Sequence, residues 1–226
     1  MDVDLKKLQR KLVTQTVADA ATQELRRRIM SGEYPDDMPL RQDALARELG
    51  VSRNPVREAL TRLENEGLVA LKPYCGYVVT ALSAEEIAEL FDLRGQLEPE
   101  LIKHAIPKMR PEDFEKAGAI LNSYEVGLDA ADIRHWGELN LSYHMALYEP
   151  SGRRRTLEMV RGLLANTDRY TRLVLTLDEG PDDAKDDHSG LLEYCRKGNV
   201  AQAMALTSDH IFRAKTNLLA MLERAG

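Results

Sequence analysis

The fold of the N-terminal part is decided by residues 49–60, which read LGVSRNPVREAL. Gly50 is typical of a helix end, and Ser52 is typical of the residue that caps the next helix. Pro55 falls in the first turn of that next helix, where a missing backbone N–H costs little. The stretch therefore predicts two helices joined by a tight turn, as in a helix-turn-helix.

Hydrophobic periodicity extends this motif in both directions. Apolar residues at helical spacing predict a helix over about residues 14–30 and a short helix over 43–49. After the helix that ends near Gly67, two short apolar runs, 68–71 and 77–80, predict a β-hairpin. Three helices followed by a hairpin predict a winged helix-turn-helix domain over residues 1–81.

The sequence after residue 81 is helical in pattern. Ser83 and Glu86 have the spacing of a capping box, which predicts the start of a long helix that ends near Ile106. Glycine and proline breaks, including one at Gly127, separate the helices predicted after it. These cover 111–127, 131–149, 153–178, 182–197 and 200–224. The fold class expected is mainly α, with an all-helical bundle of about six helices over residues 82–226.

Composition excludes several classes of protein. Hydrophobic residues make up 43% of the 226 residues, which is enough for a packed core and argues against disorder. No apolar run is long enough to span a membrane, and the first residues lack the apolar core of a signal peptide. Two cysteines, Cys75 and Cys195, cannot build a disulfide framework. We therefore expect a cytoplasmic protein that has no membrane partner.

Charge is divided unevenly along the chain. The formal net charge is -6, but residues 1–80 carry 13 basic and 12 acidic side chains, whereas the remainder carries 18 and 25. An acidic C-terminal part does not prevent the N-terminal part from binding DNA. It means that a local basic patch must supply the attraction for phosphates.

That patch is expected at the start of the third helix. In a helix-turn-helix, the helix that follows the turn enters the major groove. Here that helix would present Arg53, Asn54 and Arg57 to base edges. Arginine reads guanine and asparagine reads adenine, while Ser52 at the helix N-terminus suits a phosphate oxygen. Two arginines four residues apart are usually only solvated; the preceding turn and the following hairpin favour DNA contact.

Histidine placement is informative in the C-terminal part. His144, His188 and His210 fall on three predicted helices, and Asn140 lies one turn before His144. Three imidazoles and one oxygen donor could converge inside the bundle and bind a transition metal. The alternative is that these residues are scattered polar side chains without a common site.

The N-terminal motif resembles the signature of the GntR family of bacterial transcription regulators. The resemblance extends over about residues 14–80 and includes Leu45-Ala46, residues 49–60, Glu66–Val69 and Gly76–Val79. It implies that double-stranded operator DNA is the partner. The DNA contacts that it implies come from Arg53 and Arg57, aided by Ser52, Asn54 and Gly76. Some relatives have a DNA-contacting arginine where this chain has Asp43, and Arg41 or Arg47 could replace that contact.

The C-terminal part is similar to the FCD domain, the helical effector domain of the FadR-type branch of this family. The resemblance is carried by residues 140–144, 187–188 and 209–211. It implies a divalent transition metal, zinc or nickel, and four ligands: Asn140, His144, His188 and His210. Many members have aspartate where this chain has asparagine, and the missing charge should weaken the site. His104 and His135 match no ligand position and are expected at the surface or in helix packing.

The same resemblance implies a small carboxylate as the effector. Family members place an arginine at the position of Arg94, where it faces the ligand cavity. Beside a metal, its guanidinium could bind a carboxylate through two hydrogen bonds. The alternative is an Arg94–Glu98 pair on the helix surface. Tyr170 could line the same cavity.

We therefore expect a homodimeric transcription regulator, acting as a repressor, that performs no chemistry. One alternative is a metal-dependent hydrolase with an accessory DNA-binding domain, although the sequence has no His-Glu-x-x-His motif. The other alternative is a constitutive DNA-binding protein whose helical bundle is purely structural.

Overall fold

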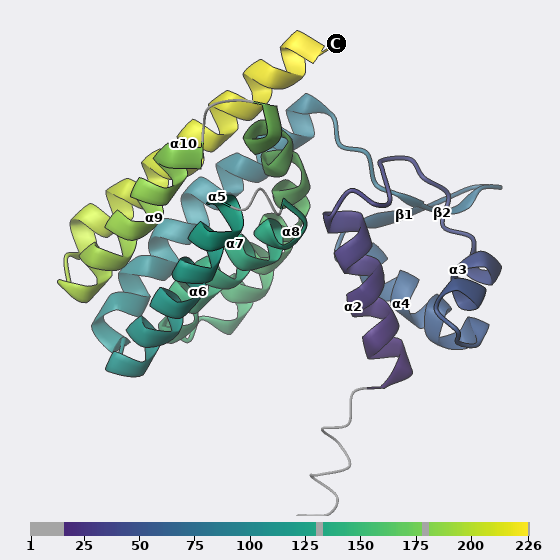
Figure 1. Ribbon diagram of the computed structural model, residues 1–226, viewed down its shortest axis with the longest axis horizontal. Helices are drawn as coiled ribbons and strands as arrows, with labels where there is room; N and C mark the ends of the chain where they lie inside the picture. Colours follow the sequence, from purple (N-terminus) through teal and green to yellow (C-terminus); the bar gives the residue numbers. More distant parts are fainter. Residues whose placement is uncertain (1–15, 130–132, 178–180, 226) are drawn as a thin grey trace, which may run out of the picture. The chain divides into compact units, whose positions relative to one another are not determined.

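The computed structural model describes residues 16–129, 133–177 and 181–225 (Figure 1). The fold is mainly α-helical, as predicted, and the chain divides into two compact units. One contains the described residues up to Ile29 together with Glu33–Thr80, and the other contains Met30–Gly32 and the described residues from Ala81 onward. Among the described residues, no helix combines the length and apolar character needed to cross a bilayer.

The first unit is the predicted winged helix-turn-helix. Its elements are α2 (Val17–Met30), α3 (Gln42–Glu48), α4 (Arg53–Asn65), β1 (Val69–Lys72) and β2 (Gly76–Val79). The two strands are antiparallel and form the hairpin with Val69 opposite Val79 and Lys72 opposite Gly76.

Helix α4 is oriented by its apolar stripe. Val56, Ala59, Leu60 and Leu63 recur at helical spacing and are completely buried in one hydrophobic cluster with residues of α2 and the hairpin. Burial of such a side chain contributes about 1.5–3 kcal/mol, so this face is held firmly against the core. The opposite face, which carries Arg57, is therefore exposed to solvent.

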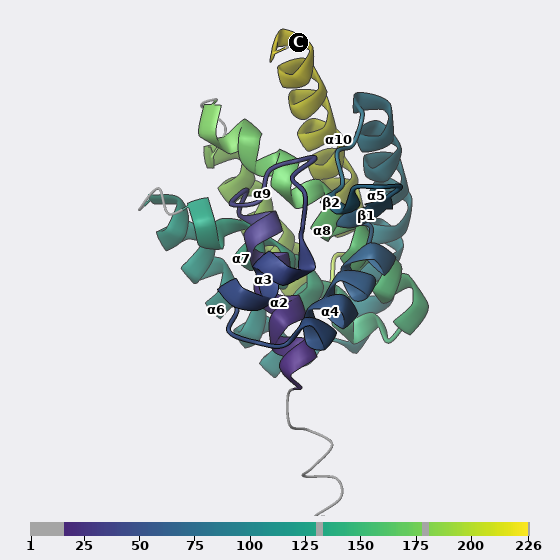
Figure 2. The ribbon, with the colours of Figure 1, turned by 90° about the vertical axis from the view of Figure 1, so that its right-hand side faces the viewer.

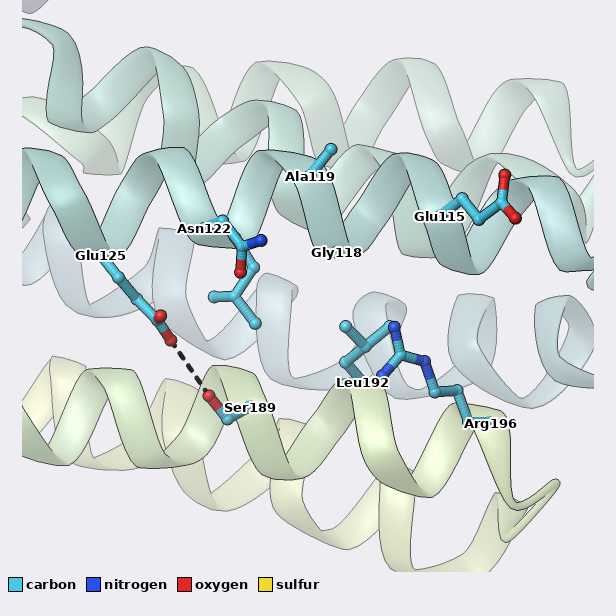
Figure 3. Close-up of a pocket in the computed structure, with 9 residues that line it drawn as sticks. Glu115, Gly118, Ala119, Asn122, Glu125, Ser189, Leu192 and Arg196 are labelled. Carbon is cyan, nitrogen blue, oxygen red and sulfur yellow. Dashed lines mark hydrogen bonds between the residues drawn. The ribbon is translucent and has the colours of Figure 1, made fainter.

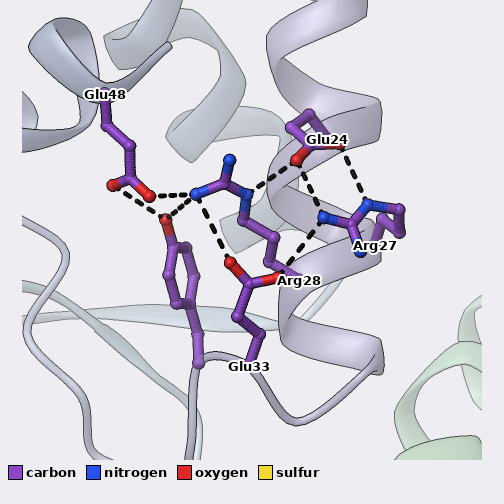
Figure 4. Close-up of polar contacts among 6 residues, drawn as sticks. Glu24, Arg27, Arg28, Glu33 and Glu48 are labelled. Carbon is purple, nitrogen blue, oxygen red and sulfur yellow. Dashed lines mark hydrogen bonds and ion pairs between the residues drawn. The ribbon is translucent and has the colours of Figure 1, made fainter. Parts of the chain in front are cut away.

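A polar cluster joins α2 to α3 on the surface of this unit (Figure 4). Arg28 on α2 donates to Glu24 on the same helix over 2.7 Å and to the Tyr34 hydroxyl over 2.9 Å. It also pairs with Glu48 at the end of α3, and the Tyr34 hydroxyl donates to that same carboxylate over 3.2 Å. The cluster fixes the helix that precedes the turn.

The second unit is a helical bundle. Its helices, in chain order, are α5 (Ala84–Ala105), α6 (Pro111–Asp129), α7 (Ile133–Tyr148), α8 (Arg154–Leu177), α9 (Pro181–Arg196) and α10 (Val200–Ala225). Short 3₁₀ turns follow α5 at Ile106–Lys108 and α7 at Glu149–Ser151. The predicted capping box is confirmed, because Ser83 accepts from the Glu86 backbone and Glu86 accepts from the Ser83 backbone.

The long helices pack side by side. Helix α10 lies along α5 (Figure 2), α6 packs on α7 and α9, and α8 packs on α5 and α7. The core between them contains three completely buried tyrosines, Tyr124, Tyr143 and Tyr148. Helix α6 continues through Gly127 to Asp129, so the break predicted at that glycine was wrong. A glycine inside a helix costs only about 1 kcal/mol, which the remaining helical turns outweigh.

Candidate functional site

The candidate DNA-binding surface is formed where α4 begins. Ser52 occupies the N-cap position with extended backbone, but its side chain makes no capping hydrogen bond, so its hydroxyl is available to a ligand. Arg53, Asn54 and Arg57 are exposed on the first turns of the helix. These side chains lie beside the partial positive charge of the helix N-terminus, which favours an anionic partner.

The two arginines differ in their surroundings. Arg53 forms an ion pair with Asp43 of α3, and both side chains are mostly exposed. Arg57 has no ion-pair partner within the described part of the chain. Arg47 donates through Nε to the backbone carbonyl of Asp43 over 3.2 Å, and the side chain of Arg41 is exposed. Asp43 thus faces Arg53 at the position where some relatives carry an arginine.

The wing projects its tip into solvent. Tyr74 is fully exposed and has a φ of 65°, and Gly76 has a φ of 78°. Glycine adopts this left-handed conformation without the steric cost that a Cβ atom would bring. The backbone at the tip is therefore accessible to a partner.

The three histidines singled out in the sequence converge in the bundle. His144 comes from α7, His188 from α9 and His210 from α10, and each offers a ring nitrogen within 4.8 Å of the other two. The Nε2 atoms of His144 and His188 are 3.2 Å apart. His144 and His188 are buried, and His210 is half-buried.

Hydrogen bonds set the tautomer of His144. The Tyr148 hydroxyl donates its proton to the Glu98 carboxylate over 2.6 Å, and the same oxygen lies 3.2 Å from Nδ1 of His144. Burial, followed by the charge of Glu98, raises the pKa of Tyr148 well above its ordinary value, so the phenol keeps its proton at neutral pH. Since that proton goes to Glu98, Nδ1 of His144 is the donor, and its Nε2 keeps a free lone pair.

His210 is held in the same tautomer by a different group. Its Nδ1 lies 2.9 Å from Oδ2 of Asp187, a carboxylate that also pairs with Arg213. Burial opposes ionisation of Asp187, but hydrogen bonds from His210 and Arg213 outweigh it and lower the pKa of the carboxyl. An ionised carboxylate can only accept, so Nδ1 of His210 donates and Nε2 is left for another partner.

The buried imidazoles are neutral at physiological pH. Burial is the main cause that lowers the pKa of both His144 and His188 well below the usual value, and the neighbouring histidines add to it. His188 also has a buried Nδ1 without a hydrogen-bond partner in the described residues. Neutral imidazole is the form that binds a metal.

Arg94 and Glu98 form a pair in the interior, not on the helix surface. Arg94 donates through Nε to Glu98 over 2.6 Å and through Nη1 to the Thr167 hydroxyl of α8 over 3.0 Å. The side chains are 5% and 0% exposed, so the pair lies in the core of the bundle. Glu98 also accepts from the Tyr148 hydroxyl, whose oxygen lies 3.2 Å from Nδ1 of His144, so a chain of polar contacts links the guanidinium to the histidines.

The remaining predicted residues lie in different places. Asn140 is buried on α7, one turn before His144. The Tyr170 hydroxyl accepts from the backbone N–H of Leu82 over 3.0 Å, and its ring packs in a cluster with Phe91. His104 is half-buried on α5 and lies 3.6 Å from Glu100, whereas the side chain of His135 falls outside the described part.

A shallow groove between α6 and α9 is distinct from these residues (Figure 3). Glu115 and Glu125 line it from α6, with Ser189 and Arg196 from α9. Ser189 donates to Glu125 over 3.2 Å. Two carboxylates against one guanidinium make this groove unsuitable for an anionic effector.

Sequence reasoning gave no role to three groups that contact the predicted site residues. Tyr148 lies four residues after His144, and that spacing could have identified it as a neighbour on the same helix face. Asp187 adjoins His188 in sequence but contacts His210. Thr167 gives no signal in the sequence, because it approaches Arg94 only through the packing of α8 on α5.

Two family models match the chain. Residues 17–79 match the model described as bacterial regulatory proteins, gntR family, and residues 89–213 match the FCD domain. The matched families and relatives are transcription regulators and not enzymes.

Relatives and solved structures agree with these matches. The transcriptional repressor GlaR of Escherichia coli K12 is 28% identical over 197 residues, which cover 83% of this chain and 89% of that protein. The gluconate operon repressor of Bacillus subtilis is 34% identical over 122 residues, 54% of this chain and 49% of that protein.

Among solved structures, Escherichia coli McbR/YncC has the same fold, with a TM-score of 0.82 at 18% identity over 92% of this chain and 99% of that one. A GntR family member from Pseudomonas syringae is 30% identical, with a TM-score of 0.55, over 92% of this chain and 86% of that one. The chain therefore belongs to the GntR family of bacterial transcription regulators, in the branch whose C-terminal unit is an FCD domain.

Proposed function

We propose that this regulator is a metal-dependent, carboxylate-responsive repressor. Its winged helix binds operator DNA, and its bundle holds a divalent transition metal at His144, His188 and His210. A small carboxylate then binds at this metal and at Arg94. The observation that carries the proposal is the convergence of three ring nitrogens within 4.8 Å inside the bundle.

The donor set supports zinc or nickel. Two nitrogens bound to one tetrahedral zinc at about 2.0–2.1 Å lie about 3.3 Å apart, close to the 3.2 Å between His144 and His188. His144 and His210 both have Nδ1 engaged as a donor, which leaves Nε2 of each free to ligate. Asn140 supplies an oxygen one turn away from His144 but brings no charge.

Charge in this region favours binding of an anion once the metal is present. The three imidazoles are neutral ligands, and Glu98 neutralises Arg94. A bound divalent ion therefore keeps its full charge and acts as a Lewis acid for a carboxylate oxygen. Without the metal, the three histidines, Arg94 and Glu98 together present no uncompensated positive charge. The effector should therefore bind only to the metal-loaded protein.

Repression and dimerisation belong to the same proposal. GlaR and the gluconate operon protein are both named as repressors. A two-fold dimer places two reading helices on successive major grooves, which compensates for a winged-helix part with nearly balanced charge. Effector binding would then shift the population between dimer geometries that fit the operator well and poorly.

The DNA-binding part is tested on α4. Arg53→Ala and Arg57→Ala should each cost about 1–3 kcal/mol of specific binding, because each removes a bidentate contact with a base. Operator duplexes are first obtained by in vitro selection with the full chain, and affinities are then measured by fluorescence anisotropy. Arg62→Ala is the matched control: it removes the same charge from α4 but pairs with Asp19 of α2. Equal losses in all three variants would contradict a base-reading role.

The metal part is tested on α7. His144→Ala should lower zinc or nickel stoichiometry in the purified protein, measured by mass spectrometry of metals and by calorimetric titration. His104→Ala is the control, because this half-buried histidine lies on α5 beside Glu100 and outside the histidine cluster. Full metal content in His144→Ala would refute the ligand set. If no metal and no carboxylate binds the wild type, the bundle is a structural part of a constitutive DNA-binding protein.

A further inference from the structure

Asp43 holds one of the two DNA-reading arginines in place. It is the second residue of α3, and its carboxylate pairs with Nε of Arg53, the first residue of α4. The ion pair thus spans the turn of the helix-turn-helix. Both side chains are mostly exposed, at 57% for Asp43 and 72% for Arg53.

This ion pair is not needed to stabilise the fold. Exposed pairs contribute little because water screens them. The two helices are already joined by buried apolar side chains, including Leu45 of α3 and Leu60 of α4. A carboxylate on the surface that meets DNA also repels phosphates, so it has a cost for binding. The property of Arg53 that this carboxylate changes is how its guanidinium meets DNA.

The position of the carboxylate matters for the arginine fork. Arginine has five N–H donors, and the carboxylate of Asp43 pairs with the guanidinium at Nε, the nitrogen next to the side-chain stem. The two terminal amino groups stay available for O6 and N7 of guanine, the pair of acceptors that arginine reads. A side chain held in this orientation loses less rotamer freedom when it docks.

We propose that Asp43 is a specificity-determining residue that orients Arg53 and suppresses its binding to phosphates. The proposal rests on the DNA-binding function proposed above. Contacts to phosphate carry no sequence information, whereas contacts to base edges do. Asp43 disfavours the contacts of Arg53 with phosphates and preorganises its contacts with base edges. It therefore lowers affinity for random DNA and preserves affinity for the operator. Arg57, which has no such carboxylate within the described part, provides the internal comparison.

The test compares Asp43→Asn with wild type in the full chain. Selected and scrambled duplexes are titrated at several salt concentrations. Asp43→Asn should bind the scrambled duplex about two- to fivefold more tightly, because this is the range of affinity change that the energy of an exposed ion pair can produce. The ratio of selected to scrambled affinity should fall by a similar factor. Asp37→Asn is the charge control, because it removes an exposed acid that pairs with Lys72 of the wing and not with α4.

Double variants separate this inference from the function on which it rests. The effect of Asp43→Asn on the ratio should vanish in an Arg53→Ala background and persist in an Arg57→Ala background. If Arg53→Ala alone leaves the selected sequence unchanged, the assigned base contact is wrong and the proposed DNA-reading role fails with it. If Arg53→Ala changes the selected sequence but Asp43→Asn leaves the ratio unaltered, only the role of Asp43 is refuted. An effect that survives in Arg53→Ala would overturn the proposal in favour of direct contact between Asp43 and a base.

Discussion

At the scale of single residues, a phenol decides what His144 can bind. Tyr148 has one hydroxyl proton and donates it in a hydrogen bond to Glu98, so the phenol oxygen can only accept from Nδ1 of His144. The lone pair of His144 is therefore on Nε2, the nitrogen that lies 3.2 Å from Nε2 of His188. The outer partners of a ligating imidazole are therefore as much a part of the candidate site as the imidazole itself.

Tyr148→Phe tests this chain of hydrogen bonds. Loss of the hydroxyl should weaken zinc binding about 10–100-fold, because Nδ1 of His144 loses its partner and the ring its fixed tautomer. The affinity is measured by competition with a chromophoric chelator. Tyr194→Phe, a half-buried tyrosine of α9 whose hydroxyl makes no hydrogen bond in the described part, is the control. Unchanged affinity in Tyr148→Phe would remove Tyr148 from the site.

Arg94 illustrates how far sequence alone can locate a side chain. Its spacing from Glu98 predicts a pair on one helix face, and the structure contains that pair. Spacing cannot tell a solvated face from a buried one, because that depends on which helix covers it. Here α8 packs on α5 and brings Thr167 to the guanidinium. The family resemblance, and not the spacing, indicated that Arg94 points inward.

At the scale of elements, the winged helix could be predicted because each of its parts has a local signal. Gly50 ends one helix, Pro55 fits the first turn of the next, and two short apolar runs mark the strands. The polar contacts between these elements could not be predicted in the same way. The cluster of Arg28, Tyr34 and Glu48 forms only after the helices are placed, and so does the pair between Asp43 and Arg53.

The polar cluster on α2 predicts a response to acid. Hydrogen bonds from Arg27 and Arg28 lower the pKa of Glu24 from 4.5 to about 2. A carboxyl whose pKa is lower in the folded state than in the unfolded state stabilises the folded state. This contribution is complete at pH values above the pKa of the unfolded state. The contribution is lost as the pH falls from about 4.5 through about 2.

Glu24→Gln should therefore make the stability of α2 depend less steeply on pH in this window. Protection of α2 amides against hydrogen exchange in the full chain measures it, with values corrected for intrinsic rates. Glu89→Gln serves as control, since this exposed carboxylate on α5 forms no ion pair in the described residues. The same pH dependence in Glu24→Gln and wild type would show that the cluster does not act as described.

At the scale of the whole molecule, the metal links ligand binding to stability. A ligand that binds only the folded state, present at 100 times its dissociation constant, stabilises that state by about 2.7 kcal/mol. Zinc at that excess should raise the free energy of unfolding of the wild type by this amount. Chemical denaturation with and without zinc measures the change. His188→Ala should show no zinc effect and His104→Ala the full effect. An equal rise in all three proteins would indicate weak surface binding in place of a defined site.

The convergence of the histidines is a property of the bundle as a whole. His144, His188 and His210 are separated by long stretches of sequence, and no periodicity places three helices so that these side chains meet. The resemblance to the FCD domain predicted the three histidines as one set, and they are brought together by the packing of α6 on α7 and α9 and of α9 on α10. Sequence therefore sufficed for each helix, whereas the shared centre depends on tertiary packing.

One turn of α8 ties two distant points of the chain together. Thr167 accepts from Arg94 beside the histidines, and Tyr170, three residues later, accepts from the backbone of Leu82. Leu82 directly follows the strand and short segment that end the winged helix. A rotation of α8 about its axis would move both anchor points at once. The residues that follow the winged helix are thus anchored to the same helix that contacts the buried guanidinium.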